Sequence, residues 1–208
     1  WVWGGGFLSQ DGALDFAGGT VVHVSAGVSA LVAAWVLGPR KASGHQERAH
    51  NLPMVLLGAA MLWFGWFGFN AGSSLAADGI AVNALMTTHL AAASALLVWS
   101  ICELVTGSRP SATGLAIGAV VGLVGVTPAA GFVDSLGAIA IGGLSSVTAF
   151  VAMHYLKRLV LDDALDVFAC HGVGGIVGSL LTGVFASTAV NPGGADGLLY
   201  GNPSQMWP

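Results

Sequence analysis

Charged side chains are scarce in this chain of 208 residues, of which only 8% are Asp, Glu, Lys or Arg. A soluble domain of this length needs roughly 25% charged residues to cover its surface. More than half of the residues, 55%, are hydrophobic, and the mean hydropathy is +0.80. This composition excludes a soluble globular domain and indicates a protein that lies in the lipid bilayer.

Basic residues and cysteines are also few. The chain has six Lys and Arg residues and a formal net charge of −4, so it carries no basic patch, which argues against nucleic acid as a ligand. Cys102 and Cys170 stand alone in apolar segments without the spacing of a metal site, and we expect them to be small packing residues. Neither a nucleophile–base pair nor a metal cluster emerges, so an enzyme is not expected. The chain begins without Met and shows no signal peptide, which indicates an internal piece of a longer protein.

Long hydrophobic runs, in contrast, fill most of the sequence. A helix that spans the membrane needs about 20 consecutive apolar residues. The sequence predicts six such spans, which are 16–38, 52–74, 80–102, 111–132, 135–156 and 166–187. Short loops between them hold nearly all of the charge. We therefore expect an all-α integral membrane domain over residues 1–208.

The basic residues fall on alternate loops. They follow the first, third and fifth predicted spans and are Arg40, Lys41, Arg48, Arg109, Lys157 and Arg158. The opposite loops carry only acids, which are Asp11, Asp78, Asp134 and Asp196. By the positive-inside rule the basic loops are cytoplasmic. This orientation places residue 1 and residue 208 on the outer side.

Two histidines lie in apolar stretches that otherwise carry no ionisable side chain. Such a residue inside a span is costly and is by default a candidate for function. HVSAGVSALV (23–32) and HGVGGIVGSL (171–180) share the His, a Gly four residues later, and then β-branched, small and Leu residues. His23 lies about 12 Å from the outer end of its span, and His171 about 8 Å from the inner end of its own. A repeated motif that enters from opposite faces is typical of an inverted repeat with one site near the midplane.

Neutral imidazole, the form favoured away from water, carries one hydrogen-bond donor and one acceptor. Two such rings can bond to each other and still present polar edges to a small neutral molecule. This suits a narrow, mostly apolar pore for a molecule such as ammonia, whereas metal cations require rings of oxygen ligands. The alternatives are histidines that only satisfy packing, and bis-histidine ligation of haem between helices, which no further feature favours.

Two acids stand at predicted helix starts. Asp15 and Asp166 are interpreted as N-caps, or as first-turn acids that the helix dipole favours. A stretch of mainly small residues, FAGG (16–19), follows Asp15. Asp15 can therefore also fix an irregular outer segment and add negative potential there.

Aromatic residues crowd the second predicted span. Trp66 and Phe69 are one helical turn apart, and Asn70 and Ser73 continue the same side. An aromatic face next to a hydroxyl can bind a small cation through cation–π attraction. A belt at the membrane interface, or packing alone, also accounts for such aromatics.

Six strings of this sequence carry a specific resemblance, in order and at matching spacing over nearly the whole chain. They are WVWGGG (1–6), ALDFAGGTVVH (13–23), HNLPM (50–54), GWFGFNAGSS (65–74), GLVGVTPAAG (122–131) and DVFACHGVGGIVGS (166–179). With them the chain resembles the ammonium transporter (Amt/Mep/Rh) family, specifically its bacterial branch. The resemblance implies an ammonium-transporter fold of inverted five-helix repeats. This chain would supply about six transmembrane helices, the fifth to tenth of eleven.

The resemblance also implies roles for individual residues. By matching motif, His23 and His171 are similar to the twin histidines of the family's pore. Trp3 and Ser73 are similar to its outer ammonium-recruitment site, with Phe69 as part of the phenylalanine gate beneath. Asp15 is similar to the acidic residue that supports recruitment without touching the substrate. The remaining residues that the resemblance assigns line or support the pore, and they are Trp66, Asn70 and Thr127.

The function that the resemblance implies is transport of ammonium or ammonia. The cation would be gathered outside, lose a proton and cross as the neutral molecule. The implied surroundings are the inner membrane of a bacterium, a homotrimer and a cytoplasmic PII-type regulator of the full-length protein, with no metal or cofactor. An ammonium-sensing membrane domain of a larger signalling protein is the alternative, and a haem-binding electron-transfer protein is a third.

Overall fold

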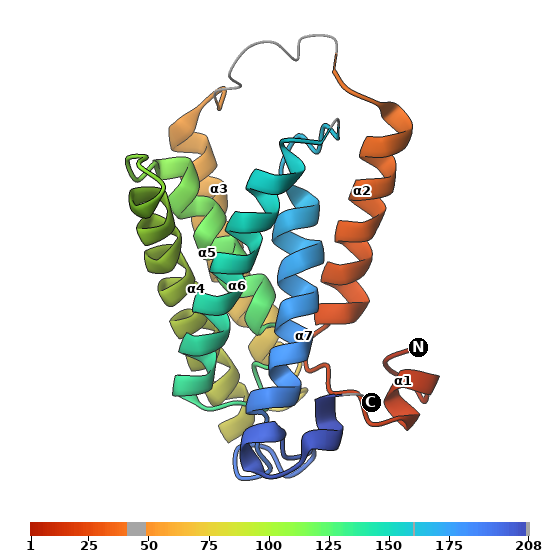
Figure 1. Ribbon diagram of the computed structural model, residues 1–208. Helices are drawn as coiled ribbons and strands as arrows, with labels where there is room; N and C mark the ends of the chain where they lie inside the picture. Colours follow the sequence, from red (N-terminus) through yellow and green to blue (C-terminus); the bar gives the residue numbers. More distant parts are fainter. Residues whose placement is uncertain (41–48, 160, 207–208) are drawn as a thin grey trace.

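The computed structural model describes residues 1–40, 49–159 and 161–206. All regular secondary structure within these ranges is helical (Figure 1). Lys41, Arg48 and residue 208, on which part of the predicted orientation depends, lie outside the described residues.

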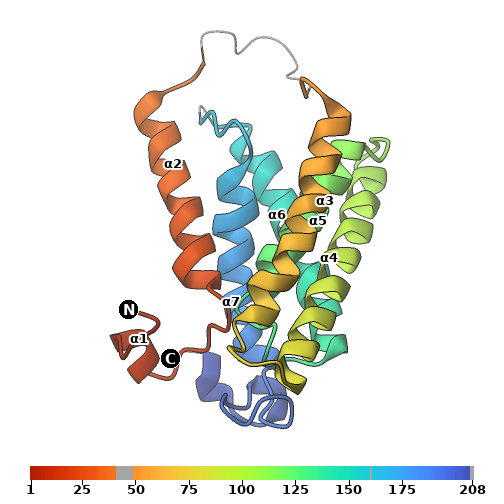
Figure 2. The same cartoon turned by 180° about the vertical axis from the view of Figure 1, so that it is seen from behind.

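The helices form one bundle that is capped at one end by short turns (Figures 1 and 2). In chain order the α-helices are α1 (Phe7–Gln10), α2 (Ser25–Leu37), α3 (Leu52–Gly72), α4 (Gly79–Val105), α5 (Ala112–Val126), α6 (Ser135–Leu156) and α7 (Gly174–Phe185). Two π-helical turns, η1 (Gly19–Val24) and η2 (Phe168–Val173), lead directly into α2 and α7. The 3₁₀ turns η3 (Leu198–Tyr200) and η4 (Pro203–Met206) follow α7.

Five of the six predicted spans correspond to helices that are long and apolar enough to cross a membrane. These are Gly19–Leu37, Leu52–Gly72, Gly79–Val105, Ser135–Leu156 and Phe168–Phe185. The fourth predicted span, 111–132, is longer than its helix, because α5 has only 15 residues and ends at Val126. The turns that follow it complete this pass through the bundle.

Proline and a distant segment explain the early end of α5. Pro128 has no N–H, so it cannot continue the hydrogen-bond ladder of the helix. The carbonyls beyond α5 are taken by residues far away in the sequence. The amide of Phe16 donates to Pro128 O at 2.9 Å, and the amide of Ala17 donates to Thr127 O at 3.2 Å. The outer segment before η1 is thereby fixed to the end of α5.

Polar N-caps define where four of the helices begin. In each case the side chain accepts a hydrogen bond from the amide three residues later, which satisfies one of the free N–H groups of the first turn. The capping residues are Asn51, Asp78, Ser111 and Asp134 for α3, α4, α5 and α6.

Successive long helices run in opposite directions, so the loops after α2, α4 and α6 meet at one end of the bundle (Figures 1 and 2). The described basic residues of these loops are Arg40, Arg109, Lys157 and Arg158. The loops at the other end contain Asp11, Asp78, Asp134 and Asp196. The predicted alternation is therefore confirmed for the described residues, because all of their Lys and Arg lie at one end of the bundle and none at the other. The first end, called the basic end below, also carries acids that include Asp162, Asp163 and Asp166, whereas the other, acidic end carries acids without a basic residue.

A bidentate ion pair ties α2 to the loop before η2 at the basic end. Arg40 Nε donates to Asp162 Oδ2 at 2.7 Å and Arg40 Nη2 donates to Oδ1 at 2.5 Å, while the backbone amide of Arg40 also donates to Oδ2, at 2.8 Å. The hydrogen bonds from Arg40 lower the pKa of Asp162 to about 2. A depressed pKa means that the pair is intact at neutral pH and is lost only as the pH falls toward that value.

Small residues let α4, α5 and α6 approach closely, as is common between membrane helices. A Cβ on Gly142 would collide with the carbonyl of Ala91 across the α4–α6 contact. Ser146 Oγ donates to Ala95 O at 2.8 Å across the same contact. Because the surrounding side chains are mostly alanine, glycine and serine, this contact has little capacity to adjust to added volume.

We expect Gly142→Ala to lower the free energy of unfolding of the full-length protein by about 1–3 kcal/mol, because the new methyl group forces the helices apart. The neighbouring Gly143 is the control, since a Cβ there would meet Val98 Cγ2 at an ordinary 3.5 Å. Gly143→Ala should leave stability unchanged or slightly higher. Unfolding in detergent measures both, and equal stability of the two variants would contradict the packing argument.

Candidate functional site

The two histidines meet between the π-helical turns. His23 in η1 and His171 in η2 lie with their Nδ1 atoms 3.2 Å apart and their ring centroids 5.2 Å apart. They are 148 residues apart in the sequence and come from helices that run in opposite directions (Figure 1). His23 is 3% exposed, and His171 is half-buried. The two histidines that the repeated motif singled out are thus in direct contact.

Glycine makes this contact possible, on both helices, four residues after each histidine. A Cβ on Gly27 would collide with the backbone of Gly172, next to His171. A Cβ on Gly175 would lie 3.2 Å from His23 Cβ. Each glycine of the repeated motif therefore lets the segment that carries the other histidine approach closely. The two copies of the motif play the same part in this contact.

A buried hydroxyl holds the far side of the His23 ring. Thr127 Oγ1 lies 3.3 Å from His23 Nε2, and it accepts a hydrogen bond from Trp66 Nε1 at 3.0 Å. Thr127 itself donates to the carbonyl of Leu123 at 2.8 Å. The threonine is fully buried, and the tryptophan is 8% exposed. The imidazole is therefore held in place through both of its nitrogens.

Aromatic rings continue from this pair along α3. The rings of His23 and Trp66 are stacked, with centroids 5.2 Å apart and an interplanar angle of 19°. Phe69 lies 5.9 Å from His23 and 5.6 Å from Trp66, measured between ring centroids. Phe69 is 41% exposed, so one side of this cluster is open in the described part of the chain.

Asn70 is buried but bonds away from the histidines. Its Nδ2 donates to Thr88 Oγ1 at 2.9 Å and so joins α3 to α4. Its Oδ1 has no hydrogen-bond partner among the described residues. Asn70 therefore supports the helix that carries Trp66 and Phe69, and it does not bond to the histidine pair.

Asp15 organises the outer segment that leads to His23. Its carboxylate accepts hydrogen bonds from the amides of Gly18, Gly19 and Thr20 at 2.9, 2.7 and 2.9 Å, and one from Thr20 Oγ1. These amides are the free N–H groups at the start of η1, where negative charge is favourable. The expectation that Asp15 fixes an irregular outer segment is confirmed, since Gly18 has a positive φ of 107°.

Trp3 and Ser73 lie at the acidic end but bond to different parts of it. Trp3 Nε1 donates to the backbone carbonyl of Asp15 at 2.9 Å, and its side chain is 50% exposed. Ser73 Oγ donates to the carbonyl of Phe69 at 2.9 Å. Within the described ranges, no hydrogen bond joins Trp3 to Ser73.

Asp166 does not cap η2 with its side chain. Its φ is 52°, and its carboxylate lies 3.4 Å from Lys157 Nζ. Asp163 takes the expected role instead, because its Oδ2 accepts a hydrogen bond from Phe168 N at 2.7 Å. The sequence holds a signal for this residue, since Asp163 precedes η2 by five residues much as Asp15 precedes η1 by four.

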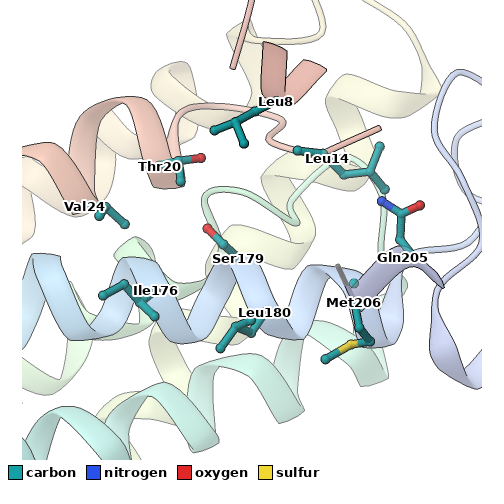
Figure 3. Close-up of a pocket in the computed structure, with 11 residues that line it drawn as sticks. Leu8, Leu14, Thr20, Val24, Ile176, Ser179, Leu180, Gln205 and Met206 are labelled. Atoms are coloured by element: carbon teal, nitrogen blue, oxygen red, sulfur yellow. The ribbon is translucent and has the colours of Figure 1, made fainter. Parts of the chain in front are cut away.

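A cavity of about 260 Å³ lies apart from the histidine pair. Figure 3 shows it between the segment from Leu8 to Val24, α7 and the last turn of the chain. Most of its lining is apolar, with Leu14, Ile176 and Leu180 among the lining residues. None of the predicted site residues lines this cavity, so it is not the predicted pore.

Direct bonding between the histidines bears on the haem alternative. A metal between two imidazole nitrogens would hold them about 4 Å apart, at about 2 Å from each. The observed Nδ1–Nδ1 separation of 3.2 Å is that of a hydrogen bond. Within the described part of the chain, no group of three or more His, Cys, Asp or Glu residues is arranged to hold a metal ion.

Membrane-length helices of alternating direction, with a polar pair enclosed between two of them, define a multi-pass helical membrane protein with an internal polar site. The family within this class follows from comparison. The chain belongs to the Ammonium Transporter Family, whose model matches residues 1–208. Members of this family are transporters and channels, so the chain is not an enzyme.

Relatives and solved structures agree on this assignment. An ammonium transporter of Aquifex aeolicus is 54% identical over 207 residues, which are 99% of this chain and 48% of the relative. The crystal structure of Saccharomyces cerevisiae Mep2 matches with a TM-score of 0.92 and 38% identity, over 99% of this chain and 48% of that one. A structure described as a sensor Amt protein matches with a TM-score of 0.88 and 35% identity, over 99% and 53%.

The fold class predicted from the sequence is therefore confirmed. The chain spans about half the length of the curated relatives that it matches. The residues that sequence reasoning missed are Gly27, Gly175 and Asp163. The two glycines were visible as part of the repeated motif, but the sequence did not show that each faces the other half.

We expect Gly27→Ala to push α2 away from η2, to lengthen the Nδ1–Nδ1 separation beyond hydrogen-bond range and to cost about 1–3 kcal/mol of stability. Gly175→Ala should have a smaller effect, because a Cβ there is tight without overlapping its neighbours. Unfolding measurements and a crystal structure of each full-length variant test this. A Gly27→Ala structure with the histidine contact intact would show that the glycine is not required.

Proposed function

We propose that the full-length protein conducts ammonium, as neutral ammonia, across the membrane past His23 and His171. The observation that carries this proposal is the direct contact of two imidazoles enclosed among apolar helices. A charged ammonium ion is costly in such surroundings, whereas a neutral molecule with N–H donors and a lone pair is not. The imidazole edges offer this molecule hydrogen bonds that lipid-like side chains cannot.

Recruitment of the cation takes place at the acidic end, at Trp3 and Ser73. The exposed indole of Trp3 and the ring of Phe69 provide aromatic faces, which attract small cations. Asp15 contributes negative charge beneath Trp3 without contacting the substrate, because its carboxylate is occupied by the amides of η1. The ion then transfers its proton to water at this exposed end, and ammonia passes Phe69 to reach Trp66 and His23.

The remaining wall of the pore comes from the part of the protein outside this chain. Relatives are about twice as long, and Phe69 stands 41% exposed beside the histidines. In our proposal the complete protein is a homotrimer in the inner membrane of a bacterium. A cytoplasmic PII-type protein is the proposed regulator, and it would act at the basic end.

The distribution of charge supports an orientation with the basic end inside. We expect a cysteine at Ser108 to react with an impermeant maleimide only from the cytoplasmic side, and a cysteine at Ala189 only from outside. Both positions are exposed, at opposite ends of the bundle. Both variants would be made in a background that lacks Cys102 and Cys170. Labelling of Ser108→Cys in intact cells would contradict the proposed orientation.

Replacing His23 and His171 together with Ala should reduce methylammonium uptake by the full-length protein at least about tenfold, because the permeating molecule loses its polar partners. His89→Ala is the control. His89 is exposed on α4 and contacts only the rings of Trp63 and Phe67 among the described ring pairs. Uptake by the double variant at the level of this control would refute the pore.

A sensing role is the second candidate function. It is favoured by the match to a structure described as a sensor Amt protein. A sensor would bind ammonium without appreciable flux. Ammonium-dependent current or uptake in proteoliposomes of the full-length protein separates the two, since binding without transport would support the sensor.

A further inference from the structure

The hydroxyl of Thr127 is contacted by three groups whose hydrogen-bonding roles can be counted. The Leu123 carbonyl lies 2.8 Å from Thr127 Oγ1, Trp66 Nε1 lies at 3.0 Å and His23 Nε2 at 3.3 Å. A threonine hydroxyl has one proton to donate and two lone pairs to accept with. The three contacts therefore use its full capacity, provided that one neighbour accepts and two donate.

Two of the three neighbours have fixed roles. A carbonyl can only accept, and the indole N–H of Trp66 can only donate. The Leu123 carbonyl also depends on this hydroxyl, because its usual helical partner, the amide of Thr127, donates to Val124 O instead. The next residue, Pro128, has no N–H. The hydroxyl of Thr127 thus donates its proton to the Leu123 carbonyl, and one of its lone pairs accepts from Trp66 Nε1.

The remaining lone pair of Thr127 faces His23 Nε2. Two lone pairs pointing at each other would repel, so this nitrogen must carry the proton of the neutral ring. Nδ1 of His23 is then bare and can only accept. His171 Nδ1, 3.2 Å away, must therefore carry a proton and donate it. The second nitrogen of neutral His171, Nε2, is left as a bare acceptor.

We propose that Thr127 is a positioning residue that sets the tautomers of both histidines and so gives the pair a direction. His23 carries its proton on Nε2, and His171 carries its proton on Nδ1. The one imidazole lone pair that no neighbouring group uses therefore belongs to His171 Nε2, and this nitrogen accepts an N–H of ammonia. This inference deepens the proposed function, and its last step rests on it, while the tautomers themselves follow from the hydrogen bonds alone.

The opposite arrangement has a structural cost that can be named. A bare His23 Nε2 would require the Thr127 proton, and the buried Leu123 carbonyl would then lose its hydrogen bond from this hydroxyl. Leu123 and Thr127 are both fully buried, so water does not replace the lost bond. The contact between the two Nδ1 atoms by itself permits either direction, and this one hydroxyl selects between them.

The test is nitrogen-15 NMR of the full-length protein with labelled histidine, because protonated and bare imidazole nitrogens resonate at well-separated frequencies. Signals are assigned by comparison with His23→Gln and His171→Gln. Once its signals are assigned, the wild-type spectrum decides between the tautomers. We expect a protonated Nε2 in His23 and a protonated Nδ1 in His171, and a protonated Nδ1 in His23 would overturn the proposal.

Two variants separate positioning from general packing. Thr127→Val keeps the shape of the side chain but removes the hydroxyl, and it should yield a mixture of tautomers at both histidines. Thr127→Ser keeps the hydroxyl and should restore the wild-type pattern. A Thr127→Val spectrum identical to that of the wild type would overturn the role of Thr127.

Transport adds a readout that depends on the proposed function. Thr127→Val should lower the maximal rate of methylammonium uptake about tenfold, with KM unchanged, because the recruitment residues are untouched. If the tautomers are as stated but the variant lacking both histidines still transports, the pore proposal fails and the assignment of Thr127 stands. If loss of both histidines abolishes transport but His23 is protonated on Nδ1, the pore proposal stands and the assignment of Thr127 fails.

Discussion

The close approach of the two π-helical turns is the constraint on which the rest of the structure depends. It brings the His23 and His171 rings to hydrogen-bond distance, and it is possible because a Cβ is absent at Gly27, where it would collide with Gly172, and at Gly175, where it would be tight. The supports around it are polar and few. Asp15 and Asp163 hold the starts of η1 and η2, and the ion pair of Arg40 with Asp162 ties the two halves at the basic end.

Most of the fold could be predicted from the sequence, because apolar helices of membrane length are recognisable from their composition. The sequence predicted too long a helix for the span 111–132. The sequence stays apolar through residues 127–131, but the helical backbone ends at Val126. The end of α5 is decided by Pro128 and by two amides from residues 16–17, and that pairing spans the chain. A prediction that considers only neighbouring residues cannot detect this pairing.

The candidate site was predictable in part for the same reason. The cost of an ionisable side chain in lipid singled out His23 and His171, and the repeated motif predicted that they would meet. The cap expected at Asp166 belongs to Asp163 instead, because Asp166 turns with a positive φ toward Lys157. Local spacing shows that an acid is near a helix start, whereas the path of the loop decides which one reaches it.

The dependence of η1 on the end of α5 has a consequence for biogenesis. His23 contacts Thr127 across 104 residues and His171 across 148, so the earlier histidine enters the bilayer long before either partner has been synthesised. Contacts of such sequence separation form late in folding. The site is therefore among the last parts of the chain to be assembled, and until α5 and α7 are inserted, His23 in η1 lacks the contacts with Thr127 and His171.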